Sequence, residues 1–164
     1  MHSVSSPLPP PEAGSDSPSA PLDTRFLESL IGYNARRAAL AIIGPVLQRL
    51  APFELRVVDF SVLTVIAHNP GVTSRQVCAA LDILPPNLVG LVRALEQRGL
   101  VEKRDHPRDR RAQGLYVTAV GAQVQARAQA AVGAVESSDL THLDAHERAT
   151  LIRLLRKIYL GPEA

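Results

Sequence analysis

The sequence predicts a mainly α-helical fold with one small β-hairpin. Apolar residues recur at helical spacing through most of the 164-residue chain, whereas two short strand-like segments occur only at residues 100–104 and 114–118. Aromatic residues make up 4% of the chain and Trp is absent, so aliphatic side chains between helices should form the core. A chain of this length is expected to build one such core.

Residues 1–21 differ in composition from the rest of the chain. They contain six Pro and six Ser, and such a segment cannot bury enough apolar surface to offset the entropy lost on ordering. We therefore expect a disordered tail. A secretory signal requires Lys or Arg near the N-terminus, and none precedes Arg25. The longest apolar run, residues 38–47, is about half the length of a membrane span. The sequence predicts a cytoplasmic protein with no membrane contact.

Two helices are expected before the first turn signal. A long helix should begin at Asp23 or Thr24, because either side chain can cap it, and Pro45 should kink or break it, because proline lacks the N–H that a helix interior uses. A second helix follows Pro52 and is apolar enough to be buried on most sides. Residues 69–71, Asn-Pro-Gly, then form a turn.

Two shorter helices follow this turn. Residues 73–76 read TSRQ, a capping box that starts a helix over residues 74–80. Residues 84–87 read LPPN and open the next helix, because proline favours the first helical position. This helix has one inward stripe, formed by Leu88, Leu91, Val92 and Leu95, and Gly99 ends it.

The hairpin after Gly99 is strongly basic. Five of the 18 Lys and Arg residues fall between Lys103 and Arg111. Such a local density attracts phosphate backbones, although a solvated loop can have the same composition. Beyond it, Thr118 and Asp144 can each cap a further helix, Asp144 in a capping box. These two helices and the first one are too apolar to stand alone, which predicts a homodimer joined through the chain ends.

The order of the elements is typical of a helix-turn-helix followed by a wing, in which one helix enters the major groove of DNA and the hairpin reaches the minor groove or backbone. Residues 95–101 read LEQRGLV, residues 104–111 read RDHPRDRR, and Tyr116-Val-Thr118 is followed by Gly121. These segments resemble the MarR family of bacterial regulators, whose pattern runs LE-x-RGLV, R-x-x-x-P-x-DRR and LT-x-x-G. The resemblance covers residues 22–160.

The resemblance implies a dimeric, ligand-responsive regulator that represses from a pseudo-palindromic operator, with a mainly α winged helix-turn-helix fold and a small β-hairpin wing. The expected parts are a disordered tail (1–21), an N-terminal dimerisation helix (22–52), a winged helix-turn-helix DNA-binding domain (53–118) and C-terminal dimerisation helices (119–164).

The resemblance also implies roles for the wing. Arg111 enters the minor groove, Asp109 holds the wing arginines by ion pairing, and Arg110 approaches the DNA backbone, with Arg108 in the same set. The residues agree with this, since a narrow A·T-rich minor groove attracts Arg. The alternative is a solvated turn whose surface ion pair contributes ~0 to 1 kcal/mol.

Base recognition should fall on the outward face of residues 85–97. Asn87 can pair with adenine, and Arg93 with guanine or a phosphate. Gly90 lies in mid-helix, where it costs about 1 kcal/mol relative to Ala, and either close approach to DNA or mere tolerance would explain it. Residues 74–76 either contact phosphates or only cap their helix. The expected DNA-contacting residues outside the wing are Ser74, Arg75, Gln76, Pro86, Asn87, Val89, Gly90 and Arg93.

Relatives in the MarR family bind small aromatic or phenolic anions between the dimerisation helices and the winged domain. Polar groups on otherwise apolar helices are therefore effector candidates, because an Arg can hold a carboxylate while His68 or Tyr33 orients the ring. Taken alone, each of these residues favours an ordinary surface or hydrogen-bonded role over effector binding. The candidate set is Tyr33, Asn34, Arg36, Arg37, Phe60 and His68. Residues 26–37 and 84–90 are also similar to members that repress nicotinate degradation and bind a hydroxynicotinate.

Other functions have less support in the sequence. No Gly-rich phosphate loop, nucleophile elbow or paired carboxylates indicate an enzyme, and no cofactor is expected. Cys78 lies on an apolar face, which favours packing over redox sensing. His142 and His146 have zinc spacing but no third ligand cluster, so we expect no metal. A winged helix used only for protein contacts stays open, although the arginine-rich wing argues against it.

Overall fold

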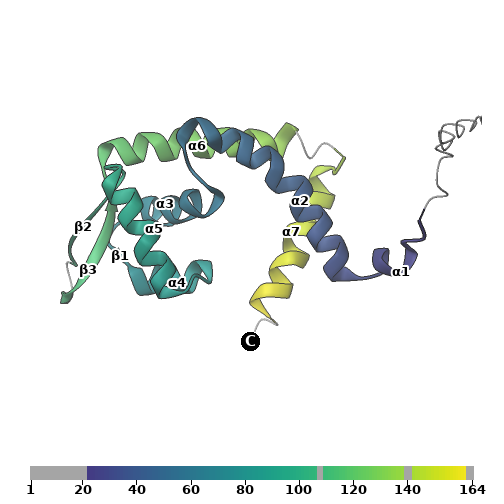
Figure 1. The fold of residues 1–164 in the computed structure, drawn as a ribbon, viewed down its shortest axis with the longest axis horizontal. Helices are drawn as coiled ribbons and strands as arrows, with labels where there is room; N and C mark the ends of the chain where they lie inside the picture. The colour runs from purple at the N-terminus through teal and green to yellow at the C-terminus, as the bar shows by residue number, and fades with distance from the viewer. Residues whose placement is uncertain (1–21, 107–108, 139–141, 162–164) are drawn as a thin grey trace, which may run out of the picture. The chain divides into compact units, whose positions relative to one another are not determined.

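The computed structural model describes residues 22–106, 109–138 and 142–161, and within these it gives the backbone but not the side chains of residues 106, 109–112 and 136–138. The predicted tail, residues 1–21, lies outside the described residues. The chain divides into two compact units, residues 1–36 and 37–164. The main-chain course is drawn in Figure 1.

The N-terminal helix differs from the predicted one. A short helix, α1 (Arg25–Glu28), ends before α2 (Ile31–Leu50), and α2 continues through Pro45. The side-chain amide of Asn34 donates to the carbonyl oxygens of Glu28 and Leu30 at 2.7 and 2.8 Å, which satisfies the backbone where the helix breaks. The prediction of a break at Pro45 is therefore wrong. The next turn packs into the core through Val46 and Leu50, which offsets the hydrogen bond that proline removes.

The predicted cap of this region is only half right. The carboxylate of Asp23 accepts the backbone N–H of Arg25 at 3.1 Å, but the Thr24 side chain caps nothing and donates to Glu28 instead. The cap therefore starts the four-residue α1 and not a long helix.

The winged helix-turn-helix forms as predicted. Helices α3 (Val57–His68), α4 (Ser74–Leu81) and α5 (Pro85–Gln97) pack on one another, and a three-stranded antiparallel sheet follows in the order β1-β3-β2. The strands are β1 (Val72–Thr73), β2 (Val101–His106) and β3 (Asp109–Val117). Strand β1 was not predicted, and β3 begins five residues before the expected Gly114.

The core of this domain consists of aliphatic side chains, as the composition predicts. Leu50, Val62, Leu63, Ile66 and Leu115 are each fully buried. From α5 the inward stripe Leu88, Val92 and Leu95 joins them, with Leu91 at its edge.

The junction between α2 and α3 is a short 3-10 turn, η1 (Ala51–Phe53), followed by Glu54 in the left-handed region with φ of 52°. Just after it, Arg56 donates to both carboxylate oxygens of Asp59, at 2.8 and 2.9 Å. The hydrogen bond from Arg56 holds the pKa of the buried Asp59 below its usual value, against the effect of burial, which raises it. The ion pair fixes the first turn of α3.

Two helices complete the chain. Helix α6 (Ala119–Ser138) packs on α3, and its first turn is capped by the Thr118 hydroxyl, which accepts the N–H of Gly121 at 2.9 Å. Helix α7 (Ala145–Leu160) begins with the predicted capping box, in which Asp144 accepts the N–H groups of His146 and Glu147. The apolar face of α7 is exposed at Leu151, Leu154, Leu155 and Ile158.

Within the described ranges, no single helix is long and apolar enough to cross a membrane. One bent pair, α4 with α5 at 113°, reaches the required length and composition only when the two are taken together.

Candidate nucleic-acid interface

One side of α5 is exposed and carries the predicted base-reading residues. Leu88, Val92 and Leu95 are buried, while the residues between them face outward. The exposed set is Pro86, Asn87, Val89, Gly90 and Arg93, with Val89 66% exposed. An exposed Val with exposed polar neighbours on a helix of this length matches a surface that a DNA major groove accepts.

Packing within the described part of the protein does not require a glycine at position 90. A Cβ added at Gly90 meets no atom within 4 Å. Gly90 also lines a hollow of about 760 Å³ together with Pro86 and Asn87 of α5 and Arg56 and Val58 of α3. The space above Gly90 is therefore open, and both explanations from the sequence, close approach to DNA and mere tolerance of glycine, remain.

The start of α4 has the predicted capping box. The Gln76 side-chain oxygen accepts the backbone N–H and the hydroxyl of Thr73, at 2.9 and 2.8 Å, and the Thr73 hydroxyl accepts the N–H of Gln76. Ser74, Arg75 and Gln76 are all exposed. The oxygen of Gln76 thus serves the helix, which leaves its amide nitrogen and the Arg75 guanidinium as the groups available to a phosphate.

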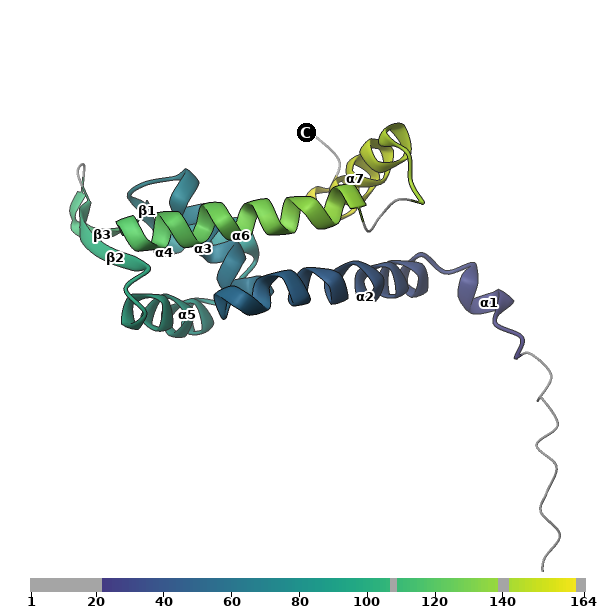
Figure 2. The ribbon, with the colours of Figure 1, turned by 90° about the horizontal axis from the view of Figure 1, so that it is seen from above.

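The wing is a two-stranded arm whose base is fixed by side-chain contacts. In Figure 2 the strands β2 and β3 extend past α5 at one end of the domain. Lys103 of β2 donates to Glu96 of α5 at 2.7 Å, and the Arg104 guanidinium pairs with Glu102 and lies 5.0 Å from the centre of the Tyr116 ring. The bond from Lys103 to Glu96 ties the arm to α5, whereas the Arg104 contact with Tyr116 joins β2 and β3 to each other.

The tip of the wing carries the predicted minor-groove residues. Arg108 lies outside the described residues, as do the side chains of Asp109, Arg110 and Arg111, whose backbone belongs to β3. The pairing register shifts between Asp105 and His106, so the strands lose their regular alignment where this basic segment begins.

The effector candidates lie on two helices. Tyr33, Asn34, Arg36 and Arg37 belong to α2, and Asn34 is occupied by the carbonyls of the α1–α2 break. Tyr33 is half-buried, whereas Arg36 and Arg37 are exposed. Phe60 and His68 belong to α3, where Phe60 packs against the core and His68 is exposed.

His68 is part of a polar cluster that the sequence reading missed. Its Nε2 lies 3.2 Å from the side-chain oxygen of Gln129 on α6, and Gln125 donates to the same oxygen at 2.6 Å. Gln125 is only 6% exposed, and the hydroxyl of Thr64, one turn before His68, is buried with no hydrogen-bond partner among the described residues. The sequence contained a signal for the burial of Gln125, because this residue lies at helical spacing from the apolar Ala128 and Val135.

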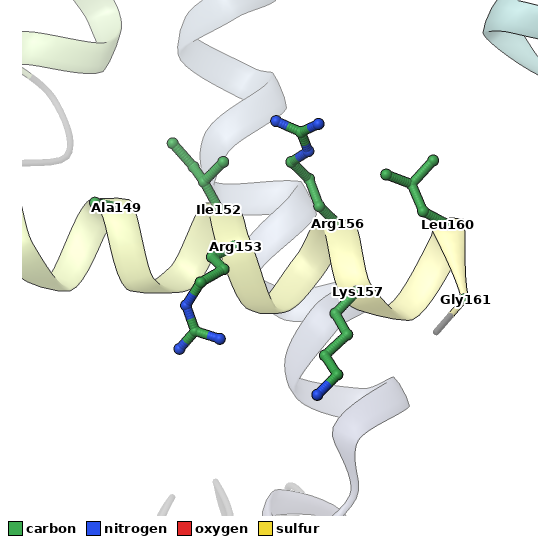
Figure 3. A pocket seen from close by; sticks show the side chains of 7 residues that line it. All are labelled: Ala149, Ile152, Arg153, Arg156, Lys157, Leu160 and Gly161. Carbon is green, nitrogen blue, oxygen red and sulfur yellow. The ribbon is translucent and has the colours of Figure 1, made fainter. Parts of the chain in front are cut away.

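A hollow of α7 gathers several cations but does not bring them together into a ligand site. It has a volume of about 850 Å³ and is lined by residues of that helix alone. Figure 3 shows Arg153 and Lys157 pointing to one side of the helix and Arg156 to the other, beside Ile152 and Leu160. Because Arg156 points away from Arg153 and Lys157, the three cations cannot converge on one ligand group.

Two further candidates from the sequence can be placed. Cys78 is half-buried against the core on the inner side of α4, as packing requires. In the part of the chain that the structure describes, no group of three His, Cys, Asp or Glu residues is arranged to hold a metal ion.

Comparison with known proteins identifies this architecture. Residues 54–112 match the MarR family. The putative transcriptional regulatory protein for the hcr operon of Thauera aromatica is 32% identical over 130 residues, which are 79% of this chain and 78% of that protein.

Solved structures of CouR also resemble the chain. The transcriptional repressor CouR bound to a 23-mer DNA duplex has a TM-score of 0.79 and 35% identity, over 85% of this chain and 99% of that one. CouR from Rhodococcus jostii RHA1 bound to p-coumaroyl-CoA has a TM-score of 0.76 and 31% identity, over 84% and 97%. These relatives are regulators and not enzymes, and the chain belongs to the MarR family of DNA-binding transcriptional regulators.

Proposed function

We propose that the protein is a repressor that binds a pseudo-palindromic operator as a homodimer and leaves it when an aromatic acid, a phenol or the coenzyme A thioester of such an acid binds. The observation that carries the DNA half of this proposal is the exposed side of α5 beside the basic wing. The domain 53–118 would read DNA, and the segments 22–52 and 119–164 would join the subunits.

Each exposed group has a role in this proposal. Asn87 pairs with adenine and Arg93 with guanine or a phosphate in the major groove, while Arg75 and the amide of Gln76 contact the backbone. Arg111 enters the minor groove and Asp109 orients the wing arginines, with Arg108 and Arg110 on phosphates. With only two polar side chains on the reading face of α5, groove shape and backbone contacts supply much of the affinity.

Replacing Arg111 by Ala tests this arrangement. We expect operator affinity to fall about 10- to 100-fold and the slope of log K against log salt to decrease by about one, because one cation leaves the interface. Fluorescence anisotropy with an operator obtained by selection of bound genomic fragments measures both quantities. Arg153→Ala removes an equal charge from α7 and is expected to leave affinity unchanged; equal losses in the two variants would refute the wing assignment.

The effector half of the proposal rests on the cluster around His68. Phe60 supplies an aromatic surface on α3, and the buried hydroxyl of Thr64 lacks a partner that a phenol or carboxylate oxygen can provide. Gln129 adds an amide group beside His68, and Gln125 donates to that amide oxygen. The CouR complex with p-coumaroyl-CoA supports an aromatic ligand, and its thioester form is one reason to include coenzyme A.

Ligand-induced stabilisation distinguishes the possible effectors. We expect p-coumaroyl-CoA, p-coumarate or hydroxynicotinate to raise the thermal midpoint, because a ligand at about 100 times its Kd stabilises the folded state by about 2.7 kcal/mol. The same ligand should weaken operator binding by roughly 5- to 150-fold. In Thr64→Val, which keeps the side-chain shape, the free protein should be no less stable while the ligand effect shrinks. If all three compounds leave both measurements unchanged at millimolar concentration, the aromatic-acid assignment is wrong.

A further inference from the structure

The C-terminal end of α5 is tied to the end of the α2–η1 segment by one side chain, Arg98. Its Nη1 donates to the carbonyl oxygen of Glu54 at 2.8 Å, and its Nη2 donates to the carbonyl oxygen of Phe53 at 2.7 Å. Carbonyl groups at the end of a helical segment lack intrahelical partners, so they are available to such a donor. The planar guanidinium presents two N–H groups at a fixed angle, which fixes direction as well as distance.

The backbone at this junction is held in an uncommon conformation. Glu54 has a left-handed φ of 52° although it is not glycine, which costs about 1 to 2 kcal/mol. Both carbonyls that Arg98 binds belong to this bend. Arg127 of α6 lies 5.6 Å from the centre of the Phe53 ring, so Arg98, which follows α5, and Arg127 both contact Phe53, the last residue of η1.

Apart from this contact, α5 is attached largely by apolar packing. Leu88, Val92 and Leu95 are buried among aliphatic side chains, and such packing is not directional. The bond from Lys103 to Glu96 ties α5 to its own wing and therefore does not fix its angle to α2. Arg98 is the directional contact that joins the C-terminus of α5 to the end of α2.

We propose that Arg98 is a positioning residue that sets the angle of α5 against α2, and through it the spacing of the two half-sites that a dimer accepts. This rests on the proposed function, because two recognition helices must face one side of a duplex. Inserting one base pair between half-sites rotates one of them by about 34°, since B-DNA has about 10.5 base pairs per turn. The fork of Arg98 limits how far the C-terminal end of α5 can shift to accommodate part of such a rotation, and an α5 held by apolar packing alone can shift further.

The test compares operators that differ only in half-site spacing. The selected operator and duplexes with one base pair inserted or removed at its centre are titrated with wild type, Arg98→Lys, Arg98→Ala and Gln97→Ala. We expect wild type and the exposed neighbour Gln97→Ala to lose about tenfold or more for each change of spacing. In Arg98→Ala the loss should shrink to about threefold or less, and Arg98→Lys, with one charge but no fork, should fall between them.

A merely structural role would lower the thermal midpoint and the affinity for all three duplexes equally. Unchanged spacing penalties in Arg98→Ala, or in Arg98→Lys if the alanine variant does not fold, would overturn the inference while leaving the proposed function intact. If wild type itself binds all three duplexes equally, the paired half-site geometry of the proposed function is wrong, and the inference falls with it.

Discussion

Gly121→Ala is expected to prevent stable folding. A Cβ at Gly121 would lie 1.9 Å from the carbonyl oxygen of Leu100 and 2.8 Å from its carbonyl carbon. These are backbone atoms, and the Leu100 oxygen already accepts the N–H of Thr118 at 3.1 Å. To remove this clash, α6 must move away from the start of β2. We expect the free energy of unfolding to fall by about 3 kcal/mol or more, at or beyond the upper end of the usual cost of an overpacked core.

The same substitution elsewhere in α6 provides the control. A Cβ at Gly133 meets no atom within 4 Å, so Gly133→Ala should stabilise the helix by about 1 kcal/mol. Thermal unfolding followed by circular dichroism measures both changes. If Gly121→Ala unfolds at the wild-type midpoint, α6 does not approach Leu100 as closely as the structure shows.

Local chemistry explains the predictions that are confirmed. The capping boxes at Thr73 and Asp144 each need only one side chain and a partner three residues away, so the sequence alone specifies them. The inward stripe of α5 needs only helical periodicity. The hairpin follows from a change of period beside Gly99, whose φ of 65° ends α5 as expected.

The features that were missed depend on tertiary contacts. Strand β1 has two residues, Val72 and Thr73, and exists because β3 pairs with it. The helix break before Ile31 is completed by Asn34, a residue six positions from one of its acceptors. Arg98 binds carbonyls more than 40 residues earlier in the chain, and backbone acceptors leave no mark in a sequence.

The exposed residues of α5 could be predicted from the sequence more completely than the polar cluster around His68, for the same reason. The reading residues of α5 are simply those that the buried stripe leaves outside, whereas the cluster of Thr64, His68, Gln125 and Gln129 joins two helices about 60 residues apart. Pro45 shows the limit of a local rule, because the buried Val46 and Leu50 keep its helix intact.

Ile158→Asp is expected to convert the proposed dimer into a monomer and so abolish tight operator binding. Leu151, Leu154, Leu155 and Ile158 lie at i, i+3, i+4 and i+7 of α7, and Ile158 is 65% exposed in the single chain. A charge there costs an isolated subunit little, but it would be buried without a partner in a subunit interface.

Light scattering is expected to give twice the chain mass of 17.6 kDa for the wild type and the single mass for Ile158→Asp. A monomer reaches only one half-site, so operator affinity should fall by about 10²- to 10⁴-fold as the second, linked contact is lost. Arg153→Gln changes a residue of the same helix that lies outside the i, i+3, i+4, i+7 spacing of the apolar stripe, and this variant should stay dimeric. A wild-type monomer that still binds the operator tightly would contradict the proposed assembly, because one subunit would then supply all the contacts that the two-fold arrangement divides between two.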